Sequence, residues 1–294
     1  MKRVQVTVTA VALLLAAWGT ASAGSTANVI FVVDESGSMG GEHVWLKDLI
    51  DDLDAGLADN NIDGYYGLVG FGGASSHLWG HKHLVGGSDF GDPTAFKAAV
   101  DTLVLNGGTE DGWDGIDTAM NDYTFHTGAA INTILVTDED RDNLNTSLLY
   151  SDVLGYLTAK EALLNVVVDA SLRNGSGAAA LGVDSEGNAY TADGSGGFTT
   201  STGGTYTSGF GTTKGDYVDM AWATEAAAWD LNQLRAGGLT AESFSKAFID
   251  IKVQEIEEQI VPEPVTMAGL VLGVGGLVGY LRRRRNVGGS DTCG

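Results

Sequence analysis

Four continuous apolar runs recur along the chain, and they restrict its possible folds more than any other feature. A strand with one face in water alternates apolar and polar residues, whereas a strand buried on both faces is apolar throughout. Helices cover both faces of a parallel sheet, so unbroken runs of this kind predict a mostly parallel sheet. The runs are ANVIFVV (27–33), YYGLVGF (65–71), INTILVTD (131–138) and LLNVVVDA (163–170).

Helical patterns lie between and after these runs. From Trp45 to Leu57, apolar residues recur at helical spacing with charged residues between them. Asp92 followed by Pro93 is typical of a helix start. Strands that alternate with helices predict an α/β fold, a doubly wound and mainly parallel sheet with helices on both faces. Further helices are expected at about 112–123, 144–162 and 241–259.

One segment breaks this alternation. Residues 172–215 are rich in Gly, Ser and Thr and contain turn-like sequences such as DSEGN. We expect one or two β-hairpins inserted into the connection between strands, with a flexible loop as the alternative. Its composition does not indicate a function.

The chain is strongly acidic, which limits its partners. It has 38 Asp and Glu against 16 Lys and Arg, a formal net charge of −22. A protein that binds nucleic acid must neutralise phosphates with the opposite charge, so we expect no nucleic-acid partner. Divalent cations and basic surfaces fit this charge better. Cys293 is the one cysteine, so we expect no disulfide in the folded body.

The first apolar run ends in a dense group of oxygen donors. Asp34, Ser36 and Ser38 alternate with Glu35 and Gly37 in the sequence DESGS. A loop that leaves a strand can turn the three alternating side chains toward one point. A carboxylate and two hydroxyls suit Mg²⁺, Ca²⁺ or Mn²⁺ better than Zn²⁺. Three oxygens do not complete six-coordination, so other segments must contribute.

Two later residues are suited to complete the set. Thr109 follows a Gly pair in LNGGTEDG, and Asp138 ends the run at 131–138. In open parallel sheets ligands bind beyond the carboxyl ends of the strands, which would place Asp34 and Asp138 on one rim. The alternative is a hydroxyl-rich helix cap, in which Ser36 and Ser38 only satisfy backbone donors.

The pattern Asp34-x-Ser36-x-Ser38, with Thr109 and Asp138 downstream, resembles the metal-ion-dependent adhesion site of von Willebrand factor type A (VWA) domains. The resemblance covers residues 26–260. It implies that Ser36 and Ser38 bind the ion directly, and that Asp34, Thr109 and Asp138 act directly or through water. It also implies one coordination position open to a carboxylate from a protein ligand.

The N-terminal residues resemble an export signal. Lys2 and Arg3 precede an apolar stretch that ends in Ala21-Ser22-Ala23. We expect residues 1–23 to be a signal peptide that is cut before Gly24, with an uncut membrane anchor as the alternative.

The C-terminal residues 261–285 resemble the PEP-CTERM sorting signal, in which a Pro-Glu-Pro motif precedes a transmembrane helix and an arginine cluster. Residues 265–281 carry no charge and are long enough to span a bilayer. The resemblance implies export in a Gram-negative bacterium, an inner-membrane intermediate, processing by an exosortase-type protease and release to the cell surface or extracellular matrix. A plain C-terminal anchor is the alternative, and 286–294 form a short tail. The signal residues are Pro262, Glu263, Pro264, Arg282, Arg283, Arg284 and Arg285.

Other motifs give little indication of catalysis. The sequence contains no G-x-S-x-G elbow, P-loop, H-E-x-x-H or paired cysteines, so we expect no enzyme. Three histidines occur together in HLWGHKH (77–83), but no cysteine or carboxylate completes a familiar zinc spacing. We interpret this segment as an exposed loop.

Together these features predict an exported surface or matrix protein that binds a protein ligand through a divalent ion. A structural matrix component whose metal only stabilises the fold is the alternative. A metal-dependent hydrolase is a third and weaker interpretation.

Overall fold

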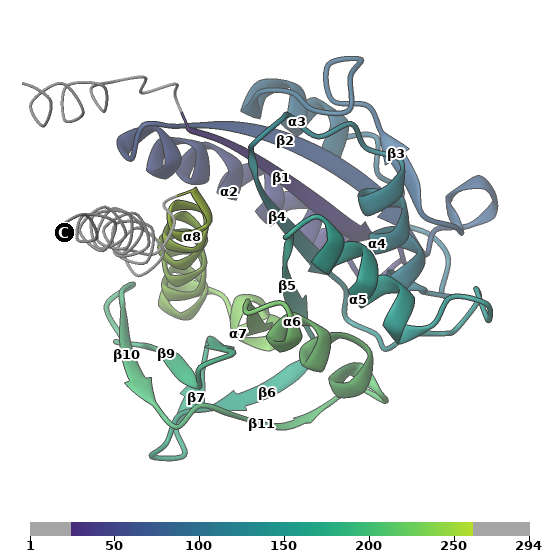
Figure 1. The fold of residues 1–294 in the computed structure, drawn as a ribbon. Coiled ribbons are helices and arrows are strands. Elements are labelled where there is room, and N and C mark those ends of the chain that lie inside the picture. The colour runs from purple at the N-terminus through teal and green to yellow at the C-terminus, as the bar shows by residue number, and fades with distance from the viewer. Residues whose placement is uncertain (1–24, 261–294) are drawn as a thin grey trace, which may run out of the picture.

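The computed structural model describes residues 25–260, which form a nine-stranded mixed sheet with helices on both faces (Figure 1). The strand order is β10-β9-β8-β12-β5-β4-β1-β2-β3. The five central strands, from β12 to β2, are parallel to one another. The predicted α/β fold with a mainly parallel sheet is therefore confirmed.

The central strands correspond to the apolar runs. They are fully or almost fully buried along most of their length, because helices cover both of their faces. The strands are β1 (Ser25–Asp34), β2 (Ile62–Phe71), β3 (His81–His83), β4 (Ala130–Val136), β5 (Leu163–Val168), β6 (Ala170–Arg173), β7 (Ala179–Ala180), β8 (Gly182–Asp184), β9 (Asn188–Ala192), β10 (Phe198–Thr202), β11 (Thr205–Gly209) and β12 (Ala227–Asp230).

Two groups of helices enclose the sheet. Helices α2, α3 and α8 pack on one face, and α4, α5 and α6 pack on the other, so each face has its own apolar core. The Asp92 side chain caps α3 by accepting from the Ala95 amide, as the sequence predicts. The helices are α2 (Gly40–Asp59), η2 (Ser75–His77), α3 (Pro93–Val100), α4 (Gly112–Asn121), α5 (Tyr150–Ala159), η3 (Lys214–Val218), α6 (Asp219–Ala223), α7 (Leu231–Arg235) and α8 (Gly238–Ile260).

The Gly, Ser and Thr-rich segment forms strands. β8, β9 and β10 pair antiparallel and extend the main sheet beyond β12. β6, β7 and β11 form a separate three-stranded sheet beside them. The predicted insertion of β-hairpins is thus present, and it lies at the edge of the sheet opposite β3 (Figure 1).

One predicted helix is shorter than expected. The pattern at 144–162 gives a helix only at Tyr150–Ala159. The preceding residues instead fold as a loop against the start of α4. There, the Arg141 guanidinium and the Asn145 amide both donate to the Asp111 carboxylate. The hydrogen bond from Asn145 holds residues near the expected helix start in this loop, so the helix begins only at Tyr150.

The predicted signal peptide at 1–23 and the predicted sorting signal at 261–285 lie outside the described residues. Between residues 25 and 260, no helix combines the length and the apolar character that crossing a membrane requires.

Candidate metal centre

The loop between β1 and α2 alternates its side chains between two sides. Asp34 ends β1, and its carboxylate accepts from the Ser36 amide at 2.7 Å and from the Thr137 hydroxyl at 2.8 Å. Glu35 points the other way, toward β2 and β3. Its backbone is fixed by hydrogen bonds from its amide to the Phe71 carbonyl and from the Asn106 amide to its own carbonyl.

Four of the five predicted ligands meet at the carboxyl ends of β1 and β4. The Ser36 and Ser38 hydroxyls lie 3.1 Å apart, and Ser38 Oγ donates to Asp138 Oδ1 at 2.9 Å. Asp34 and Ser36 are buried, whereas Ser38 is exposed, so the group runs from the core to the surface. We call these residues the rim cluster: Asp34, Ser36, Ser38 and Asp138.

An arginine balances the charge of the rim cluster. Arg235, at the end of α7, lies 2.9 Å from Asp138 Oδ2 and also donates to Glu42 Oε1 at 2.7 Å. Asp138 therefore has one oxygen on Ser38 and the other on Arg235. No local sequence pattern indicated this arginine, because it lies nearly 100 residues after Asp138.

Thr109, the fifth predicted ligand, lies in the loop before α4. Its hydroxyl donates to the Gly108 carbonyl at 2.9 Å rather than to any member of the rim cluster. The loop itself lies close to the site, because the Asn106 backbone amide donates a hydrogen bond to the Glu35 carbonyl. The Asn106 side chain also holds the loop by accepting from the Ala74 amide. Thr109 is thus beside the rim cluster without a direct hydrogen bond to it.

Glu110 is a further carboxylate at this site, beyond the five predicted ligands. It is fully buried, and neither of its carboxylate oxygens has a hydrogen-bond partner. A Cβ built on Gly72 would lie 3.1 Å from Asp34 Oδ1 and 3.1 Å from Glu110 Cγ, so the two carboxylates flank the same glycine. A buried carboxylate without a partner is costly, which indicates a place for a cation.

Burial and mutual repulsion affect both carboxylates. Burial raises the pKa of Asp34 to about 7, despite hydrogen bonds from Ser36 and Thr137 that lower it. Burial, followed by the charges of Asp34, Glu139 and Asp142, raises the pKa of Glu110 to about 8. A divalent ion would favour the ionised forms of both groups.

The donors present fit a hard divalent cation. Carboxylate and hydroxyl oxygens are the ligands of Mg²⁺, Ca²⁺ and Mn²⁺, and the rim cluster contains no nitrogen or sulfur donor. The cluster lies at the carboxyl edge of a parallel sheet, where open α/β sheets bind their ligands.

The interpretation of residues 77–83 as an exposed loop is wrong. His81 and His83 belong to β3, which pairs with β2 from Leu68 to Gly70, and His83 is 8% exposed. Alternate residues of a strand share a face, so His81 and His83 point the same way and Lys82 points away to pair with Asp89. His77, from η2, completes a group of three rings around Glu35.

The missing carboxylate of this histidine group is therefore Glu35, from the middle of the predicted adhesion motif. Burial raises the pKa of Glu35, but hydrogen bonds from the Val104 amide and from His77 Nδ1 help to hold the pKa below its usual range. We call these residues the histidine cluster: Glu35, His77, His81 and His83.

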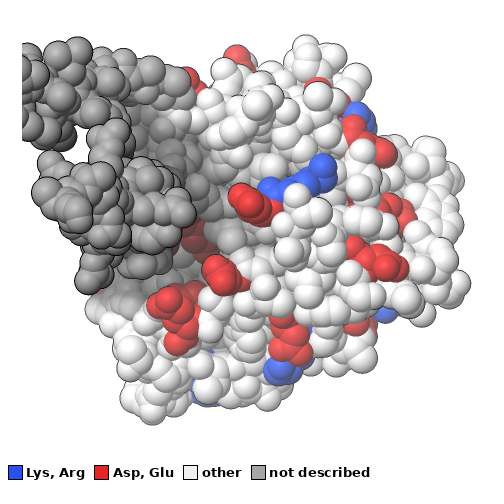
Figure 2. Space-filling model, in the orientation of Figure 1, with Lys and Arg blue, Asp and Glu red and all other residues white. Residues whose placement is uncertain are grey.

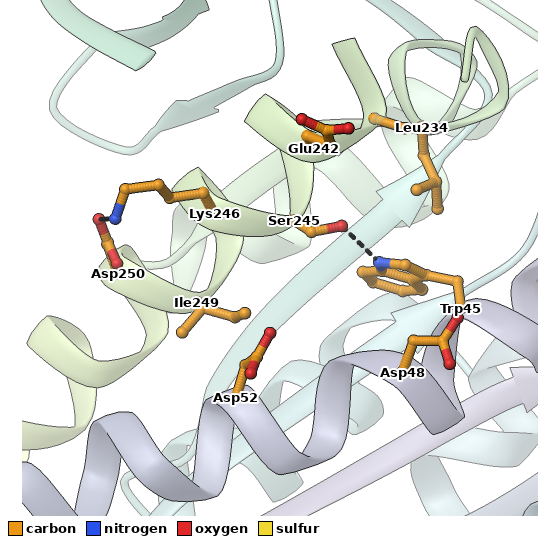
Figure 3. Close-up of a pocket in the computed structure, with 10 residues that line it drawn as sticks. Trp45, Asp48, Asp52, Leu234, Glu242, Ser245, Lys246, Ile249 and Asp250 are labelled. Atoms are coloured by element: carbon orange, nitrogen blue, oxygen red, sulfur yellow. Dashed lines mark hydrogen bonds and ion pairs between the residues drawn. The ribbon is translucent and has the colours of Figure 1, made fainter. Parts of the chain in front are cut away.

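A separate groove of about 560 Å³ lies between α2 and the start of α8 (Figure 3). Trp45 Nε1 donates to Ser245 Oγ at 3.0 Å across it, and Lys246 pairs with Asp250 at one end. Asp48, Asp52 and Glu242 also line the groove. None of its residues belongs to the rim cluster or the histidine cluster, so the groove is not part of the metal centre.

The surface agrees with the acidic composition. On the face shown in Figure 2, acidic side chains are spread widely and basic ones are confined to a few places. This distribution does not favour an anionic polymer as a partner.

Comparisons with known proteins give weak similarity. No family model and no curated protein matches the chain. An aerotolerance-related membrane protein of Bacteroides fragilis matches at 15% identity and a TM-score of 0.46, over 79% of this chain and 99% of that one. Proximal thread matrix protein 1 of the mussel byssus, with a zinc-occupied MIDAS motif, matches at 17% identity and a TM-score of 0.38, over 49% of this chain and 36% of that one. The SpRpn10 VWA domain matches at 14% identity and a TM-score of 0.37, over 49% of this chain and 74% of that one.

Proposed function

We propose that the chain is a VWA-type binding protein that holds Mg²⁺ or Ca²⁺, or alternatively Mn²⁺, at the rim cluster. Asp34, Ser36, Ser38 and Asp138 are the proposed ligand residues, and Thr109 acts through water. The observation that carries this proposal is the convergence of Ser36, Ser38 and Asp138 in one hydrogen-bonded chain at the carboxyl edge of the sheet. The buried and unpaired Glu110 beside Asp34 supports it, because it supplies negative charge to the same place.

The ion has a binding role in this proposal. Ser38 is exposed, so an ion at the rim cluster would be reachable by a partner protein. The remaining coordination position accepts a carboxylate from that partner. We propose no catalytic role for the site.

The chain is proposed to act outside the cell. In this proposal residues 1–23 direct export, and the sorting signal at 261–285 brings the protein through an inner-membrane intermediate to an exosortase-type protease. The product is released to the surface or extracellular matrix of a Gram-negative bacterium. Mass spectrometry of the mature protein tests this, since processing predicts a start at Gly24 and an end within residues 261–264. An intact arginine cluster on the mature protein would instead indicate a permanent anchor.

Calorimetry of the purified chain with Mg²⁺, Ca²⁺ and Mn²⁺ tests the site. We expect one bound ion, and loss of that binding in Asp34→Ala. Retention on cell-surface material, with and without chelator, then tests adhesion. If the wild-type chain binds the ion but its retention is insensitive to both chelator and Asp34→Ala, the metal only stabilises the fold. If none of the three ions binds, the site proposal fails.

A further inference from the structure

The histidine cluster is compact and is held by three separate elements. Its four side chains each offer one ligand atom, and these atoms all lie within 4.8 Å of one another. His77 Nδ1 lies 2.9 Å from Glu35 Oε2, and His81 Nε2 lies 3.2 Å from the same oxygen. His83 Nε2 lies 3.4 Å from Glu35 Oε1. One buried carboxylate thus faces three ring nitrogens.

In His81 and His83, the ring nitrogen that faces away from Glu35 makes a hydrogen bond, which determines where each ring carries its proton. His81 Nδ1 lies 2.8 Å from the Trp79 carbonyl, which can only accept, so this nitrogen carries a proton. His83 Nδ1 lies 2.6 Å from Thr102 Oγ1. That hydroxyl donates to the Ala99 carbonyl, so it accepts from the ring. In the neutral form, both rings therefore direct an Nε2 lone pair toward Glu35.

Lone pairs that face a carboxylate repel it, so this arrangement requires positive charge between them. His81 Nε2 and His83 Nε2 are both buried and make no hydrogen bond despite their short distances to Glu35. His77 can donate its Nδ1 proton to Glu35 as a neutral ring, so the other two rings decide the charge balance. Protonation of both His81 and His83 would supply positive charge, but their ring centroids are only 4.8 Å apart. Two adjacent imidazolium ions would repel one another, whereas one divalent cation would satisfy every inward-facing atom.

We propose that Glu35, His77, His81 and His83 bind a divalent transition-metal ion, with Zn²⁺ as the preferred ion. Imidazole nitrogen with one carboxylate oxygen is a donor set that Zn²⁺ accepts in tetrahedral geometry, whereas Mg²⁺ and Ca²⁺ prefer oxygen alone. Bonds of about 2.0–2.1 Å in a tetrahedron place the ligand atoms roughly 3.4 Å apart. The distances between Glu35 and the three rings already approach this value.

The surroundings of the cluster match those of a metal site. Trp79 and Thr102 hold the outer nitrogens of His81 and His83, which is the orienting contact that metal-bound histidines usually make. The Val104 amide donates to Glu35 Oε1 at 2.8 Å and orients the carboxylate. Gly70 leaves space in β2, because a Cβ there would lie 2.6 Å from Glu35 Oε2 and 2.8 Å from His83 Nε2.

The proposed ion is structural. Four protein ligands close a tetrahedral site, whereas a catalytic zinc keeps a position open. The ion would join the β1–α2 loop, η2 and the edge strand β3 at one point.

Competition of the purified full chain with a zinc-chelating dye tests the proposal. We expect one tightly bound Zn²⁺, and at least about 100-fold weaker binding in His77→Ala and His81→Ala, since loss of a ligand exceeds the 10–100-fold cost of losing an orienting contact. These two side chains are 27% and 25% exposed, so their removal leaves the core intact. His126→Ala is the matched control, because His126 lies outside the cluster and should bind zinc as the wild type does.

Two further measurements separate this site from the rim cluster. X-ray absorption of the zinc-loaded chain should show nitrogen and oxygen neighbours at about 2.0–2.1 Å with imidazole scattering. Mg²⁺ calorimetry of His81→Ala should match the wild type, which also shows that the variant is folded. Equal zinc affinity of wild type and His81→Ala would overturn the proposal, as would loss of the zinc in Asp34→Ala with retention in His81→Ala.

Discussion

The two sides of the β1–α2 loop differ in almost every respect that matters to a metal ion. The rim cluster offers only oxygen, extends to the exposed Ser38 and is partly neutralised by Arg235. The histidine cluster offers three nitrogens around one carboxylate, and Glu35 and His83 are buried. Adjacent residues, Asp34 and Glu35, belong to different sites. Since alternate side chains of extended backbone point to opposite sides, one short loop can serve two metal chemistries.

The largest expected effect is that each site can lose its own ion while the other site keeps its ion. Asp34→Ala should weaken Mg²⁺ or Ca²⁺ binding by at least about 100-fold and leave Zn²⁺ binding unchanged, whereas Glu35→Gln should do the reverse. Glu35→Gln keeps the shape of the side chain and removes its charge. Paired calorimetric titrations of both variants with both ions check this. If either variant loses both ions, the two clusters are not independent sites.

Zinc removal should affect stability strongly. Zn²⁺ at 100 times its dissociation constant contributes about 2.7 kcal/mol to the free energy of unfolding. For a domain of this size that corresponds to a rise in melting temperature of roughly 5–10 °C. We expect this rise when Zn²⁺ is added to chelator-treated wild type, and none in Glu35→Gln. Differential scanning calorimetry measures it, and an equal rise in the variant would place the stabilising ion elsewhere.

Gly70→Ala should weaken the histidine cluster selectively. The added Cβ would come within 2.6 Å of Glu35 Oε2, so the carboxylate must move. We expect roughly 10–100-fold weaker Zn²⁺ binding, as for other changes that displace a ligand. Mg²⁺ binding should stay near the wild-type value. Gly67 also lies on β2 but does not border Glu35, so Gly67→Ala serves as a control for the general effect of substitution in this strand.

Arg235→Gln should change Mg²⁺ binding at the rim cluster and the stability of the chain. Loss of the Arg235 guanidinium beside Asp138 removes a positive charge that competes with the ion. Mg²⁺ binding should therefore strengthen by roughly 2–5-fold, as expected for a partly exposed charge pair. Glu42 then loses its partner, so the free energy of unfolding should fall by about 1–2 kcal/mol, less than for a fully buried pair because the arginine is 35% exposed. Denaturant unfolding and calorimetry measure both effects. Unchanged Mg²⁺ affinity would mean that Asp138 is not near the ion.

Thr109→Ala should have the smallest effect. Its hydroxyl is directed to the Gly108 carbonyl, so its loss should change the binding free energy by no more than about 0.5 kcal/mol, or roughly twofold. Mg²⁺ calorimetry checks this. A loss as large as that in Asp34→Ala would show that the loop at 105–110 rearranges to bring Thr109 onto the ion.

The fold was accessible from the sequence because its signals are local. Each central strand is a continuous apolar run, and Asp92-Pro93 marks a helix start within two residues. The helix predicted at 144–162 begins later because Asn145, near its expected start, donates to Asp111, which lies 34 residues earlier in the chain. A pattern of apolar spacing carries no information on such distant partners.

The two clusters also differ in whether their residues are close together in the sequence. Asp34, Ser36 and Ser38 are close in sequence, so their convergence could be predicted from the loop alone. The histidine cluster requires that β3 pair with β2 in a register that places His81 and His83 against Glu35. The three histidines were a visible signal, but the carboxylate that completes them lies 42 residues before His77. The burial of Glu110 also depends on tertiary packing, so no local sequence pattern predicts it.

Anomalous diffraction from one crystal form soaked separately with Zn²⁺ and Mn²⁺ tests the existence of two distinct metal sites most directly. We predict a zinc peak among Glu35, His77, His81 and His83, and a manganese peak beside Asp34, Ser36, Ser38 and Asp138. A zinc peak at the rim cluster with no peak among the histidines would contradict the two-site account.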